Sequence, residues 1–212
     1  MTHRGRLRTR VALVSGVVLG VALAASGSTP AVASAQADAT AGSVRCAQVD
    51  SGFRPTSLAI DGVVGSTKVL ALGQDQHGVP RPPPLTGRGK WQFAWDKASG
   101  VRPGGPEGVV RLTAHTYPRE GSTDPALGNM LLAGLGAGDR IEVSGGGGER
   151  LCYRVTRRVE VSTNDSLSGY YATTGSPRLA ILVCSGIRRG PGDWSHRTIW
   201  YAEPTLAALE RS

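Results

Sequence analysis

The stretch RLAILVCSG, residues 178–186, contains five consecutive apolar residues followed at once by Cys184. A run of this length, with a charged residue before it and a glycine soon after, predicts a strand that is apolar on both faces. Such a strand suits a closed barrel in which a helix or loop covers the outer surface. We therefore expect this strand to lie at the centre of the fold.

Seven other short apolar segments are bounded by Gly, Pro, Asp or Asn, as strands usually are. They are SLAI (57–60), VVGSTKVLALG (63–73), WQFAW (91–95), GVVRLTAH (108–115), RIEVSG (140–145), LCYRVTRRVEVS (151–162) and RTIWYA (197–202). Only residues 126–135 and 205–211 have helical patterns. The sequence thus predicts an all-β (mainly β) fold, a closed eight-stranded β-barrel with one or two short helices. We expect the proline-rich residues 79–85 to form a rigid extended connector.

The N-terminus has the pattern of an export segment. Four arginines among the first ten residues precede a 15-residue apolar run, and an Ala-Ser-Ala cleavage pattern ends at Ala35. Residues 1–35 are expected to be either a cleaved signal or a membrane anchor, because the apolar run is shorter than the about 20 residues of a typical span. Residues 36–56 are expected to be a flexible stalk, and residues 57–212 one domain. The domain would then be extracytoplasmic, either anchored to the cell membrane or secreted.

The charge of the chain does not indicate a nucleic-acid partner. The formal net charge is +8, but four positive charges lie in the first 35 residues, which contain no acid, so that +4 remains. No run of five or more basic residues occurs after residue 35. A role in nucleic-acid binding is therefore not expected.

Cys184 and His115 are candidate catalytic residues because each ends an expected strand, where proteins often present reactive groups. Imidazole also exchanges protons near neutral pH, as the partner of a thiol nucleophile must. Each residue has a simpler alternative: Cys184 as a small core residue, and His115 as a hydrogen-bonded residue at a strand terminus. His196 is a weaker candidate, because the charge of its neighbour Arg197 disfavours the protonated imidazole.

Arg197 is the third candidate. An antiparallel hairpin in which paired residue numbers sum to 381 places Arg197 beside Cys184 on one face of the sheet. A guanidinium in this position lowers the pKa of the thiol and can donate hydrogen bonds to an oxyanion. The alternative is a surface cation that pairs with Asp193 or Glu203.

The order His115, Cys184, Arg197, with spacings of 69 and 13 residues, resembles that of the sortase family. The flanking blocks are similar to sortase blocks as well: WQFAW (91–95), PGGPEGVVRLTAHTYP (103–118), ALGNMLLAGLGAGDRIEV (126–143), LAILVCSG (179–186) and HRTIWYAEP (196–204). The resemblance covers most of the chain after residue 56 and is greatest to class F, the accessory sortases of high-GC Gram-positive bacteria.

The resemblance implies an eight-stranded sortase-type barrel, no cofactor, and a transpeptidase that cuts a Leu-Pro-x-Thr-Gly-like sorting signal of secreted proteins after its Thr. Cys184 would form a thioacyl intermediate, His115 would act as acid and base, and Arg197 would steady the substrate and its oxyanion. An amine of the cell wall or of a pilin would then accept the acyl group. The loop 162–177 is expected to contact the sorting signal.

Two positions depart from the sortase pattern. Val183 stands where the family usually has Thr, and Ala114 where it more often has Gly. The match implies that both positions lie by the bound substrate, so the change at Val183 removes a hydroxyl that could assist the oxyanion region.

The chain has three cysteines, an odd number, so at least one thiol remains unpaired. A disulfide between Cys46 and Cys152 would leave Cys184 free, whereas a pairing that used Cys184 would abolish activity. Geometry decides between these pairings.

Other classes of cysteine enzyme fit poorly, because papain-like and cell-wall peptidases place Cys before His, and the Ser-His-Gly-Cys signature of L,D-transpeptidases is missing. The remaining alternative is a non-catalytic barrel of the same fold that binds envelope peptides. Selective labelling of an activated Cys184 would distinguish the two. The sequence does not specify an oligomeric state.

Overall fold

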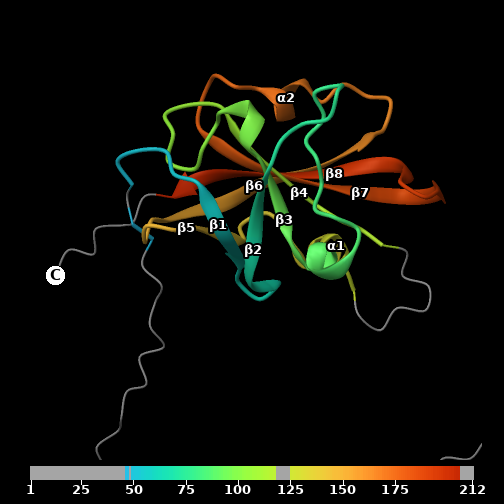
Figure 1. Ribbon diagram of the computed structural model, residues 1–212, viewed down its shortest axis with the longest axis horizontal. Coiled ribbons are helices and arrows are strands. Elements are labelled where there is room, and N and C mark those ends of the chain that lie inside the picture. The colour runs from blue at the N-terminus through green and yellow to red at the C-terminus, as the bar shows by residue number, and fades with distance from the viewer. Residues whose placement is uncertain (1–45, 48, 118–124, 206–212) are drawn as a thin grey trace, which may run out of the picture. The chain divides into compact units, whose positions relative to one another are not determined.

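The computed structural model describes residues 46–47, 49–117 and 125–205, all within the compact unit Ser43–Ser212. Its elements are β1 (Pro55–Ile60), β2 (Val64–Leu72), η1 (Gly87–Trp91), β3 (Phe93–Asp96), η2 (Lys97–Ser99), β4 (Val109–Ala114), α1 (Leu127–Gly134), β5 (Arg140–Gly145), β6 (Arg150–Ser162), α2 (Ser168–Tyr171), β7 (Arg178–Gly190) and β8 (Asp193–Thr205). The strands form a closed barrel in the order β1-β2-β3-β4-β7-β8-β6-β5, which confirms the fold class predicted from the sequence (Figure 1).

Strand β7 occupies the central place that its sequence predicts. Leu179, Ile181 and Val183 are fully buried in the main core inside the barrel. Ala180 belongs to a second cluster outside the barrel, together with Tyr170 of α2. Successive side chains of a strand point to opposite faces. Because β7 packs against one cluster on each face, all of residues 179–183 are apolar.

The β7–β8 hairpin is longer than the sequence predicts. We expected a loop after Cys184 and a returning strand that begins at Arg197, but β7 continues to Gly190 and β8 begins at Asp193. The register shifts after Ser185, at Gly186, which has a φ of 76°. A β-bulge lets two strands continue to pair on both sides of an irregular residue. The glycine at this position had instead indicated the start of a loop. In Figure 1 the hairpin extends well beyond the rest of the barrel.

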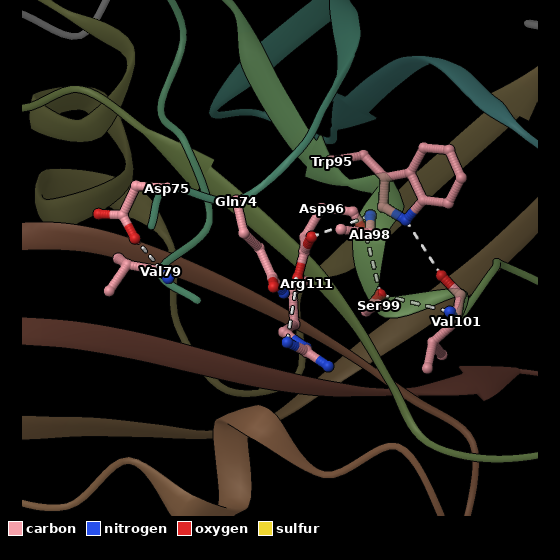
Figure 2. Close-up of polar contacts among 9 residues, drawn as sticks. All are labelled: Gln74, Asp75, Val79, Trp95, Asp96, Ala98, Ser99, Val101 and Arg111. Carbon is pink, nitrogen blue, oxygen red and sulfur yellow. Dashed lines mark hydrogen bonds and ion pairs between the residues drawn. The ribbon is translucent and has the colours of Figure 1, made fainter. Parts of the chain in front are cut away.

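A buried ion pair joins β3 to β4. The Arg111 guanidinium donates to the Asp96 carboxylate at 3.0 Å, and both side chains are almost fully buried. The same carboxylate accepts from Gln74 at 2.7 Å and from the backbone N–H of Ala98 at 3.1 Å (Figure 2). These bonds connect the chain that leaves β2 to the wall of the barrel.

The chain after Gln74 forms a tight turn. The Asp75 carboxylate accepts the backbone N–H groups of Val79 and His77, which lowers the pKa of Asp75. Gln74 also pairs with Pro80 in an isolated antiparallel bridge. The turn therefore sets the direction in which the proline-rich residues 79–85, called the strap below, leave the sheet.

The described residues before β1 lie against the barrel. Cys46 and Cys152 form a disulfide with a Cα–Cα distance of 5.4 Å, and Cys184 is a free thiol. Phe53 is buried in the main core, and its backbone N–H donates to Pro103. The part of the expected stalk that the structure describes is thus held at two points, and β1 begins at Pro55, two residues before the expected start.

The helix expected over 126–135 is α1. Of the second expected helix, 205–211, Thr205 ends β8 and the other residues lie outside the described part of the chain. The export segment 1–35 also lies outside it. Among the described residues, no helix has the length and apolarity needed to cross a membrane. Helix α2, which the sequence did not predict, has only four residues.

Candidate active site

Strands β4 and β7 bring His115 and Cys184 to the same end of the barrel. The two strands are parallel, and their pairing ends with Ala114 opposite Val183. His115 and Cys184 are therefore the next residues on neighbouring strands. Beyond Val183, β7 keeps only β8 as a neighbour, and the open side becomes the edge of a cavity.

The antiparallel pairing of β7 and β8 places Arg197 directly opposite Cys184, in the register predicted from the sequence. The Arg197 guanidinium donates to the backbone carbonyls of His196 at 2.9 Å and Trp194 at 3.2 Å. These two bonds hold the Arg197 side chain against the backbone of β8.

The pKa of the Cys184 thiol is higher than that of an exposed thiol. Burial raises its pKa because a low-dielectric environment disfavours the thiolate, and the nearby charge of Arg197 opposes this effect in part. At neutral pH the thiol form therefore dominates. A nucleophilic role requires that the proton be removed when a substrate binds.

Contacts on two sides hold His115. Its Nε2 lies 2.5 Å from the backbone carbonyl of Pro83 in the strap. The His115 carbonyl accepts the backbone N–H of Gly128, next to the start of α1, at 2.8 Å. The ring also packs edge-on against Tyr117, with 5.8 Å between ring centroids.

A cavity of about 500 Å³ contains all three predicted residues. Its walls are the strap, the end of β4 with residues 115–117, the outward face of β7, and the β7–β8 hairpin. Val79 and Leu85 of the strap line it and are 47% and 69% exposed, so they give the cavity an accessible apolar wall. The cavity thus combines an apolar wall with a thiol, an imidazole and a guanidinium.

The two positions at which the sequence departs from the sortase pattern are paired with each other across β4 and β7, and both are buried in the main core. Ala114 also borders the cavity, whereas Val183 is not part of its lining. Leu182 and Cys184 face the cavity on either side of Val183. The described residues that line the cavity include none from the loop 162–177, whose helix α2 covers the outer face of β7 instead.

The contributions of the strap and of Tyr117 to the cavity were not predicted from the sequence. The prolines predicted a stiff extended segment, but no local pattern indicates that it lies over His115. Nothing in the sequence marked Tyr117 as part of the site, because a tyrosine in a turn-like segment is common. Within the described residues, no cluster of His, Cys, Asp and Glu has the arrangement of a metal site.

Several solved structures with similar folds are sortases. Sortase C1 of Streptococcus agalactiae, in complex with MTSET, has a TM-score of 0.52 and 17% identity over 77% of this chain and 74% of that chain. Sortase C1 of Streptococcus suis has a TM-score of 0.51 and 15% identity, covering 77% and 78%. Sortase C-1 of Actinomyces oris has a TM-score of 0.50 and 22% identity, covering 72% and 75%.

No protein-family model and no curated protein matches this sequence. The likeness to solved structures covers about three quarters of the chain at low identity, so it concerns the arrangement of the strands. The chain has the closed eight-stranded barrel fold of sortases.

Proposed function

We propose that this chain is a sortase-type cysteine transpeptidase. The observation that carries the proposal is the pairing of three strands: β4 and β7 in parallel and β7 and β8 in antiparallel register bring His115, Cys184 and Arg197 to one cavity. The apolar strap wall suits an extended peptide bound beside the thiol. Among sortases, the sequence blocks favour class F.

In the first half-reaction, the Cys184 Sγ attacks the Thr carbonyl carbon of a Leu-Pro-x-Thr-Gly-like signal. The thiol proton passes to His115, a C–S bond forms, and the negative oxygen is stabilised by Arg197. The Thr–Gly C–N bond then breaks, and His115 gives the proton to the leaving amine. A thioester to Cys184 remains.

In the second half-reaction, an acceptor amine attacks the thioester carbon and gives a proton to His115. The C–S bond breaks, a new amide forms, and the proton returns to Cys184. One amide thus replaces another without a cofactor. The acceptor is an amine of the cell wall or of a pilin; one solved neighbour is described as a pilus-related sortase C.

The substrate proteins are secreted, so the catalytic domain lies outside the cytoplasm, either anchored by residues 1–35 or released from them. Residues 57–212 form the catalytic domain of this proposal.

The test uses residues 36–212 with the disulfide formed, as wild type and Cys184→Ala. Each protein is incubated with a library of Leu-Pro-x-Thr-Gly-like peptides and a glycine or diamine acceptor, and products are identified by mass spectrometry. We expect ligated products and a thioacyl adduct on Cys184 in the wild type only. If no peptide acylates Cys184, the chain is instead a peptide-binding barrel without catalysis.

A further inference from the structure

The backbone that follows His115 is clamped by the start of α1. Asn129 is buried, accepts the backbone N–H of Tyr117 at 3.0 Å and donates to the Tyr117 carbonyl at 2.9 Å. This pair of bonds replaces the partner strand that the chain loses after β4. Next to Asn129, a Cβ on Gly128 would lie 2.5 Å from the His115 carbonyl oxygen, so only glycine allows this approach.

Tyr117 connects this clamp to the strap. Its hydroxyl donates to the backbone carbonyl of Leu85 at 3.1 Å, while its ring packs against His115. The strap is thus tied down two residues after Pro83, whose carbonyl contacts the imidazole. The side chain of Tyr117 therefore links the positions of Pro83 and His115.

The Pro83 carbonyl determines which ring nitrogen of His115 carries a proton. A carbonyl oxygen only accepts hydrogen bonds, so His115 Nε2 must be the donor. In the neutral imidazole, the lone pair that can take up a proton is then on Nδ1. The position of this carbonyl is restricted by its surroundings. Pro83 is buried between two further prolines, and residues 73–81 form a hydrogen-bonded turn.

We propose that Tyr117 and Asn129 are positioning residues that, through the strap, hold His115 as its Nε2–H tautomer. Nδ1 is then the nitrogen that exchanges protons with Cys184 and the leaving amine, a step that rests on the proposed transpeptidase function. The thiol proton moves to Nδ1, giving an imidazolium that keeps Nε2–H on the Pro83 carbonyl. The same Nδ1 proton then passes to the leaving nitrogen.

The tautomer is measured by NMR of ¹⁵N-histidine-labelled protein, residues 36–212, above the pH at which His115 protonates. A His115→Gln sample identifies the His115 signals. We expect a protonated Nε2 and an unprotonated Nδ1. A protonated Nδ1 in the wild type overturns the proposal whatever the peptidase assays show.

The Tyr117→Phe variant tests the positioning role, since it removes only the bond to Leu85. We expect a mixture of the two tautomers, and a kcat about fivefold lower with unchanged KM, as the loss of one hydrogen bond predicts. Asn129→Leu should shift the tautomer in the same way. Thermal unfolding of both variants establishes that they fold.

The matched control is Thr67→Val. It removes a side-chain hydroxyl bond of 2.6 Å to the Trp91 carbonyl, at the far end of the same β2–β3 connection. We expect the wild-type tautomer in this control. A wild-type tautomer in folded Tyr117→Phe would refute the role of Tyr117, whereas a wild-type chain with the expected tautomer but no acylation of Cys184 would refute only the transpeptidase function.

Discussion

Cys184 on β7 lies directly opposite Arg197 on β8, as neighbouring residues of one antiparallel pair. The thiol experiences two opposing effects: burial raises its pKa, and the guanidinium lowers it. The balance between them determines how much thiolate is present at a given pH. It also makes the reactivity of Cys184 a direct measure of what Arg197 contributes.

Replacing Arg197 with Ala should make Cys184 less reactive. Without the cation, burial acts unopposed, so the pKa rises and less thiolate exists at neutral pH. The alkylation rate with iodoacetamide, measured against pH, should show its midpoint at higher pH than in the wild type. Arg197→Lys should lie between the two, because it keeps a charge. Arg189→Ala, on an exposed part of the hairpin outside the cavity lining, is the control; an unshifted profile in Arg197→Ala would contradict this prediction.

Removing the Asp96 carboxylate should destabilise the domain strongly. The Asp96→Ala variant leaves the buried Arg111 without its counter-ion, and breaking a buried pair in this way costs about 3–5 kcal/mol. Denaturant unfolding measures the change. The double variant with Asp96→Leu and Arg111→Leu should lose less stability than Asp96→Ala, because it buries no unpaired charge. A double variant as unstable as the single one would show that the ion pair is not the cause.

A methyl group at Gly186 should disturb the β7–β8 hairpin. The residue has a φ of 76°, and a Cβ there would lie 2.4 Å from the Ser195 hydroxyl. We expect Gly186→Ala to lower the free energy of unfolding by about 1–3 kcal/mol, the usual cost of strained backbone, and to slow the alkylation of Cys184. Gly190→Ala is the control, since nothing lies near its Cβ position. Equal stability of the two variants would argue against a constrained bulge.

Loss of the disulfide should weaken the whole domain. It links residues 106 positions apart, and removing such a bond costs about 2–5 kcal/mol, mainly because the unfolded chain gains freedom. Cys46→Ser should therefore unfold at lower denaturant concentration than the wild type. Thiol titration should find one free thiol in the native wild type and three after reduction. More than one thiol in the native protein would contradict the pairing.

Much of the barrel could be predicted from the sequence because its signals are local. The apolar run 179–183 predicted a strand buried on both faces, and the structure confirms this with two separate clusters. The pairing of Cys184 with Arg197 rested on an assumed hairpin register, which the structure confirms. The strand spacing alone did not determine it, because two register shifts lie between this pair and the turn.

The features that the sequence did not predict depend on contacts between distant segments. Residues 79–85 carry the signal of stiffness, but their position over His115 depends on Gln74 reaching Asp96 and on Tyr117 reaching Leu85. The continuation of β7 past Gly186 depends on pairing with β8. Helix α2 has only four residues, too few for a periodic pattern.

The parallel pairing of β4 with β7 allows the lengths of some loops between them to vary. His115 and Cys184 are adjacent because of backbone bonds between two strands, and none of those bonds involves the connections that lie between them in sequence. Since the entropic cost of a longer loop grows slowly, the connections that follow α1 can gain or lose residues while the pair stays in place. The paired strands are therefore a scaffold around which the later loops can vary in length while His115 and Cys184 keep their places.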